Sequence, residues 1–145
     1  MTEPDLNIVL PEWASLKEAA RIAREKAYAP YSQFRVGAAV LTDNSQIYQG
    51  CNVENASYGL TICAERVAVC SAVAAGLTRL KAICISLSDM AVPCGACRQF
   101  LNEFHPEMWV LCDQVVDDAI DDRPPQLFRL SQLLPHAFRF GGSTR

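Results

Sequence analysis

The 145-residue sequence lacks the features of several broad classes of protein. It contains no apolar run close to the roughly 20 residues that a membrane-spanning helix needs. It has 13 lysines and arginines against 16 aspartates and glutamates, so a net charge of −3 leaves no surplus of cations for a long nucleic acid. Residues 1–5 show neither the basic region nor the apolar centre of a signal peptide. We therefore expect a cytoplasmic protein that binds neither membranes nor polynucleotides.

Histidine is scarce and the cysteine count is odd, which limits the metal and disulfide chemistry that the chain can use. Seven cysteines cannot all pair within one chain. In a reducing compartment we expect most of them to be buried thiols or metal ligands. His105 and His136 lie late in the chain among proline and phenylalanine, which fits surface or capping positions better than metal ligation.

The rest of the composition is that of a globular domain, with 50% apolar and 20% charged residues and no internal repeat. Apolar spacing and the positions of proline and glycine predict one layered α/β domain over residues 1–145, with helices packed on a mixed sheet. Helices are expected over residues 12–27, 63–75, 93–104 and 131–134, strands over 36–42, 46–51, 80–87, 108–112 and 126–129, and loops over 52–62 and 117–125.

Two short segments carry residues suited to chemistry, namely 63–66 (CAER) and 93–98 (PCGACR). Each lies at the predicted start of a helix, where the helix dipole favours thiolates. Cys94 and Cys97 lie one helical turn apart and can hold one zinc ion together. Cys63 would be a third ligand and would leave the fourth position open, as in catalytic zinc sites.

The neighbours of Cys63 are predicted to complete this site. Three thiolates leave zinc with a net charge of about −1, and Arg66, one turn beyond Cys63, can offset that charge by donating to thiolate sulfur. Glu65 points away from the ligand direction, so we expect it to carry protons rather than bind the metal.

The cysteine pattern alone leaves two other interpretations open. A Cys-x-x-Cys pair at a helix start is also typical of thioredoxin-like redox sites, and it can be half of a closed structural zinc site. Cys51 is the best candidate for a fourth ligand in a closed site. Cys70 and Cys84 fit buried small hydrophobic residues better.

Five blocks of sequence, in this order, resemble the small zinc-dependent cytidine deaminases: residues 29–39 (APYSQFRVGAA), 50–59 (GCNVENASYG), 63–66, 93–99 and 133–138. The all-cysteine site followed by arginine resembles the homotetrameric form, whereas related deaminases have histidine in place of Cys63. The resemblance implies a three-layer α/β/α fold with a mixed sheet of about five strands. It also implies one Zn²⁺ per chain held by Cys63, Cys94 and Cys97, with Glu65 as the proton shuttle.

The same resemblance implies a set of substrate contacts. These are Phe34 against the pyrimidine, the backbone N–H of Ala64 to the pyrimidine carbonyl, Asn52 and Glu54 to the ribose hydroxyls, and Tyr58 and Phe138 near subunit interfaces, with Phe138 reaching a neighbouring site. Taken without the resemblance, Asn52 and Glu54 also fit a solvated loop, and the two phenylalanines fit core packing.

The implied activity is hydrolytic deamination of cytidine and 2′-deoxycytidine in pyrimidine salvage. The alternatives are a deaminase of the same fold acting on another aminopyrimidine nucleoside of the blasticidin type, or one acting on a base in a polynucleotide. A non-catalytic zinc module would need a fourth protein ligand. Two segments depart from the family pattern. Residues 88–93 form a short loop, which leaves substrate breadth open, and 114–125 are unusually acidic and expected to lie away from the chemistry.

Overall fold

A computed structural model describes the protein over residues 4–116 and 123–141. The helices are α1 (Leu6–Val9), α2 (Trp13–Glu25), the short 3-10 helix η1 (Tyr58–Leu60), α3 (Ala64–Ala74), α4 (Gly95–Asn102) and α5 (Leu130–Leu133). The strands are β1 (Gly37–Thr42), β2 (Ile47–Cys51), β3 (Leu80–Leu87), β4 (Trp109–Gln114) and β5 (Gln126–Arg129). Within this part of the chain, no helix is both long and apolar enough to cross a bilayer.

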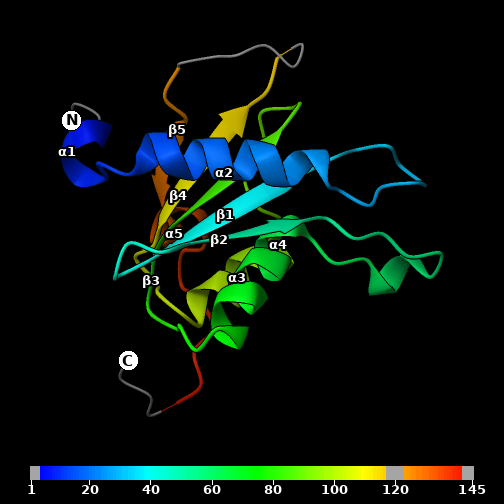
Figure 1. Cartoon of the computed structure of the whole chain (residues 1–145). Coiled ribbons are helices and arrows are strands. Elements are labelled where there is room, and N and C mark those ends of the chain that lie inside the picture. The colour runs from blue at the N-terminus through cyan, green and yellow to red at the C-terminus, as the bar shows by residue number, and fades with distance from the viewer. Residues whose placement is uncertain (1–3, 117–122, 142–145) are drawn as a thin grey trace.

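The five strands form one mixed sheet in the order β2-β1-β3-β4-β5 (Figure 1). The β3–β4 pair is parallel and is joined through α4, whereas the other three pairs are antiparallel. Both β1 and most of β3 are buried, as expected for central strands covered on two faces. The predicted mixed sheet of about five strands is therefore confirmed.

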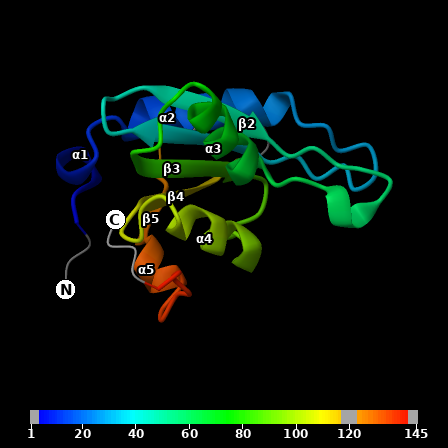
Figure 2. The same cartoon turned by 90° about the horizontal axis from the view of Figure 1, so that it is seen from below.

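Helices cover both faces of this sheet, because alternate residues of each strand point to opposite sides. Ala39 and Leu41 of β1 pack in a cluster with α2, while Ala38 and Val40 pack with α3. Figure 2 shows α2 on the far side of the strands from α4 and α5. The predicted three-layer α/β/α arrangement is confirmed.

Two glycines let the helices lie directly on the hairpin. A Cβ on Gly37 would lie 2.0 Å from the carbonyl oxygen of Ala20 in α2, and one on Gly50 would lie 2.2 Å from the backbone nitrogen of Ala68 in α3. Neither position has room for a side chain. α3 therefore packs directly on β2, and this helix begins at the residue after Cys63.

The predicted helices and strands agree with the structure to within a few residues at each end, and the loop expected over residues 52–62 contains the short helix η1. The four-residue helix α1, capped by the side chain of Asp5, was not predicted. Cys70, expected to be buried, is exposed. It lies on the side of α3 away from Ala68 and Ala72, which face the core. The acidic stretch 117–122 and the tail beyond residue 141 lie outside the described residues.

Candidate metal centre and substrate site

Three cysteine side chains converge where two helices begin. Cys63 is the N-cap of α3, Cys94 is the N-cap of α4, and Cys97 lies in the first turn of α4. Their Sγ atoms all lie within 4.8 Å of one another, and those of Cys63 and Cys94 are 4.0 Å apart. We call these three residues the thiol cluster.

The thiol cluster has the dimensions and the chemistry of a zinc site. Zinc–sulfur bonds of about 2.3 Å at tetrahedral angles place two sulfur atoms about 3.8 Å apart, close to the distance observed. In residues 4–116 and 123–141, no other histidine, cysteine or carboxylate belongs to the group. Three protein ligands leave the fourth position open, which is the arrangement of catalytic rather than structural zinc.

The alternative fourth ligand lies outside the thiol cluster. Cys51 is half-buried, and its thiol contacts the carbonyl oxygen of Lys26 at 3.5 Å. Cys84 is buried in the core cluster beneath α2, as predicted. His105 accepts a hydrogen bond from the backbone N–H of Glu107, which is a capping interaction. The closed structural site therefore has no support in the described part of the chain.

The electrostatics of the cluster favour a thiolate at Cys63. The pKa of the Cys63 thiol is lowered to about 5, chiefly because Cys97 donates a hydrogen bond to it, against the opposing cost of burial. Arg66 adds to the effect, since its Nη2 lies 3.4 Å from Cys63 Sγ. The pKa of Cys97 is raised because this thiol keeps the proton that it shares with Cys63. Arg66 thus lies where the sequence predicted a compensating cation.

Glu65 is a buried carboxyl at the edge of the thiol cluster. It is 5% exposed, and its Oε2 lies 3.7 Å from Cys97 Sγ. Burial is the main cause that raises the pKa of this carboxyl above its usual range. A carboxyl with a raised pKa is suited to accepting a proton and returning it near neutral pH.

Two loops project together beyond the end of the β1–β2 hairpin that lies opposite its turn (Figures 1 and 2). We call them the loop pair, residues 28–36 and 52–62. Backbone hydrogen bonds join them, from Tyr28 to Asn52 at 3.0 Å and from Glu54 to Tyr28 at 2.9 Å. Cys63 follows the second loop, so the loop pair ends at the thiol cluster.

The predicted sugar-binding residues lie side by side in the loop pair. The Asn52 amide accepts from the backbone N–H of Val36 at 2.9 Å and donates to the carbonyl of Phe34 at 2.8 Å. The Glu54 carboxylate accepts hydrogen bonds from the backbone and hydroxyl of Ser32. Phe34 itself is 37% exposed, so it is not a core residue.

The remaining predicted site residues lie at a helix start or on the surface. Ala64 is the first residue of α3, so its backbone N–H has no hydrogen-bond acceptor within the helix. Tyr58 is 78% exposed at the tip of the loop pair and contacts Tyr31 edge-on.

Phe138 lies beside a cavity whose lining does not include the thiol cluster of its own chain. It is 72% exposed and borders a cavity of about 460 Å³ together with Phe104 and Phe140. Its carbonyl accepts hydrogen bonds from Gln99 and Asn102 of α4. The ring is therefore open to a second molecule.

Residues 12–113 match the family described as the cytidine and deoxycytidylate deaminase zinc-binding region. The match spans most of the chain and includes the thiol cluster, Glu65 and Arg66. Zinc is therefore the cofactor, and the thiol cluster can hold one metal ion within the zinc-binding region.

Individual relatives agree with the family match. The chain is 42% identical over 129 residues to a cytidine deaminase of Mycobacterium tuberculosis, which covers 88% of this chain and 90% of the relative. It is 43% identical over 126 residues to a cytidine deaminase of Halalkalibacterium halodurans, with coverage of 85% and 90%. The crystal structure of cytidine deaminase from Burkholderia pseudomallei superposes with a TM-score of 0.79 at 45% identity, over 86% of this chain and 98% of that chain. The chain belongs to the family of zinc-dependent cytidine and deoxycytidylate deaminases.

Proposed function

We propose that the protein converts cytidine and 2′-deoxycytidine to uridine and 2′-deoxyuridine by hydrolysis, with release of ammonia. The observation that carries this proposal is the thiol cluster with one open position, next to the buried carboxyl of Glu65. The substrate class is supported by the relatives from Mycobacterium tuberculosis and Halalkalibacterium halodurans, which are named cytidine deaminases.

Glu65 carries the protons in this mechanism. Zinc bound by the thiol cluster supplies a Lewis acid that lowers the pKa of water toward neutrality. Glu65 accepts a proton from the attacking water and donates it to N3 of the ring while the water oxygen bonds to C4. Glu65 then takes the proton that remains on the C4 hydroxyl and donates it to the amino group. The C4–N bond breaks, ammonia leaves, and C4 keeps the water oxygen as the carbonyl of uridine. Arg66 donates a hydrogen bond to Cys63 and so keeps that ligand in its thiolate form.

The loop pair and the start of α3 bind the nucleoside. We assign Phe34 to the face of the pyrimidine and the backbone N–H of Ala64 to its carbonyl. Asn52 and Glu54 bind the sugar hydroxyls, which favours a free nucleoside over a base within a polynucleotide. The partial exposure of Phe34 and the polar atoms gathered at Asn52 and Glu54 support these roles.

The protein acts as a homotetramer of single-domain chains, in the cytoplasm and in pyrimidine salvage. Tyr58 and Phe138 lie at its subunit interfaces, with Phe138 reaching the site of a neighbouring chain. This assignment is supported by the exposure of both rings, 78% and 72%, which leaves them accessible to another chain, and by the exposed Phe140 that borders the same cavity as Phe138.

The direct test measures deamination by the zinc-loaded protein. Cytidine, 2′-deoxycytidine and a cytosine-containing single-stranded DNA are supplied separately, and the loss of cytidine absorbance is followed together with ammonia release. The proposal predicts turnover of the two nucleosides and none of the DNA. No turnover of either nucleoside at one zinc per chain, or turnover of the DNA alone, would overturn it.

A further inference from the structure

Ser32 makes hydrogen bonds to both Glu54 and Phe34 and so connects the two loops of the loop pair. Its Oγ donates to Glu54 Oε2 and accepts from the backbone N–H of Phe34, 3.0 Å away. Its backbone N–H donates to Glu54 Oε1 at 3.1 Å, next to the N–H of Tyr31 at 3.0 Å. One serine therefore connects the residue assigned to the pyrimidine with a residue assigned to the sugar.

The Glu54 carboxylate can accept one more hydrogen bond from a ligand. Each oxygen of an ionised carboxylate accepts about two hydrogen bonds. Oε1 already receives two, from the backbones of Tyr31 and Ser32, while Oε2 receives one, from the Ser32 hydroxyl. One acceptor position remains on Oε2, and the Ser32 hydroxyl determines the direction in which it points.

The Ser32 hydroxyl is itself held in one orientation. A hydroxyl has a single proton, and the contact from the Phe34 N–H occupies one of its lone pairs, so the proton points to Glu54. Gln33, which lies between Ser32 and Phe34, has a φ of 58°, and a positive φ is uncommon for a residue with a side chain. The turn over residues 31–34 thus depends on the contacts that Ser32 makes on both sides.

We propose that Ser32 is a positioning residue for sugar recognition, which orients the Glu54 carboxylate so that its one free acceptor receives a hydroxyl of the nucleoside sugar. This inference rests on the proposed function and adds to it a determinant of sugar specificity. It is consistent with the pKa of Glu54, which is lowered chiefly by the Ser32 hydrogen bond, so the carboxylate is ionised and accepts hydrogen bonds only.

The test compares wild type and Ser32→Ala on cytidine, 2′-deoxycytidine and 3′-deoxycytidine. A hydrogen bond to a charged group corresponds to a change of about tenfold or more. We expect wild type to lose about that much kcat/KM with the analogue that lacks the hydroxyl bound by Glu54. In Ser32→Ala the KM for cytidine should rise about tenfold, kcat should change much less, and the preference for that hydroxyl should largely disappear. Ser32→Thr, which keeps the hydroxyl, should restore the preference.

Two further variants separate positioning from a general structural role. Ser15→Ala, at an exposed position of α2, is the matched control and should leave both constants unchanged. Combined with Glu54→Gln, Ser32→Ala should add little further loss, since Ser32 acts through Glu54. An unchanged hydroxyl preference in Ser32→Ala, or an equal fall in kcat/KM for all three nucleosides, would refute the positioning role and leave deamination itself standing. A wild type that deaminates none of them would instead refute the proposed function.

Discussion

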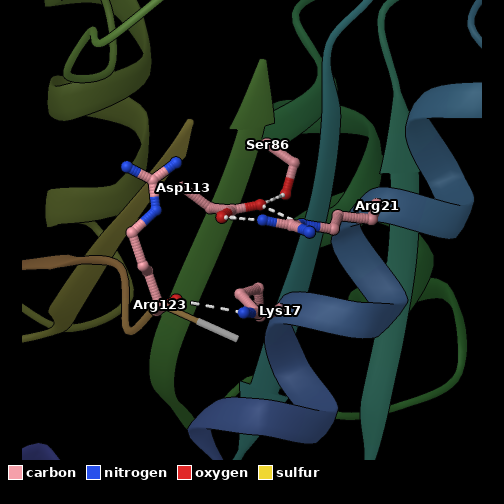
Figure 3. Close-up of polar contacts among 5 residues, drawn as sticks. All are labelled: Lys17, Arg21, Ser86, Asp113 and Arg123. Atoms are coloured by element: carbon pink, nitrogen blue, oxygen red, sulfur yellow. Dashed lines mark hydrogen bonds and ion pairs between the residues drawn. The ribbon is translucent and has the colours of Figure 1, made fainter. Parts of the chain in front are cut away.

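Replacing Asp113 by alanine should destabilise the protein without altering its active site. Asp113 lies in β4 on the face of the sheet covered by α2, and it is 3% exposed (Figure 3). Its two carboxylate oxygens accept from Arg21 Nε at 2.8 Å and Arg21 Nη2 at 2.7 Å. Ser86 of the neighbouring strand β3 donates to the same carboxylate at 2.6 Å. One carboxylate therefore ties α2 to the two parallel strands.

The expected loss follows from removing the shared acceptor. Deleting one partner of a buried ion pair costs about 3–5 kcal/mol, because the charge that remains buried loses the carboxylate that compensated it. The Arg21 side chain is 18% exposed and can take up water, so the lower end of this range applies, about 3 kcal/mol. For a chain of this length that corresponds to a fall in Tm of roughly 6–12 °C.

The assay is thermal unfolding of the zinc-loaded protein at one fixed concentration, because subunit association and bound metal both raise Tm. Glu18→Ala, an exposed carboxylate of the same helix α2, is the control and should stay within about 0.5 kcal/mol of wild type. A triple variant with Arg21→Met, Asp113→Leu and Ser86→Ala should recover most of the lost stability, since apolar groups can replace a buried ion pair. Asp113→Ala with a Tm equal to that of Glu18→Ala would refute this reasoning.

Three further predictions concern the thiol cluster. Cys97→Ala should lose zinc and unfold more easily, as metal binding is coupled to folding, whereas Cys84→Ala should keep a full zinc content, checked by elemental analysis. Arg66→Gln should lower zinc affinity about 10- to 100-fold against a competing chelator, because Cys63 loses the hydrogen bond at 3.4 Å; unchanged affinity would mean that Arg66 has no effect on the metal. In chelator-treated protein the thiolate of Cys63, with a pKa lowered to about 5, should be present above that pH and disappear below it. Iodoacetamide labelling read by mass spectrometry should therefore modify Cys63 at pH 7 and spare the buried Cys84; equal labelling of the two would contradict the assignment.

Part of the thiol cluster could be predicted from the sequence because the geometry within each helix start is local. Cys94 and Cys97 lie one turn apart, and Arg66 follows Cys63 by three residues, so helical spacing alone brings their side chains together. That α3 and α4 begin at the same place was not local information. The sequence supplied it only as the hypothesis that two cysteine-bearing helix starts share one metal ion, and the resemblance of several blocks of sequence to one family added to that hypothesis.

The features that could not be predicted depend on contacts between distant residues or on weak patterns. The Ser32–Glu54 and Arg21–Asp113 pairs are separated by 22 and 92 residues, and no periodicity indicates such partners. The helix α1 is only four residues long, too short for an apolar repeat. Cys70 was placed in the core wrongly, because α3 is rich in alanine and valine on nearly all sides and its buried face is poorly marked.

The central claim is that Glu65 carries protons beside the thiol cluster without binding the metal, and the activity and zinc content of Glu65→Gln test it most directly. Glutamine preserves the size of the buried side chain but cannot accept and return a proton. We expect one zinc per chain, a Tm close to that of wild type, and a loss of cytidine deamination at or beyond the upper end of the 10²- to 10⁴-fold typical of general acid–base catalysis. A variant that retained a tenth of the wild-type activity, or that lost its zinc, would contradict the account.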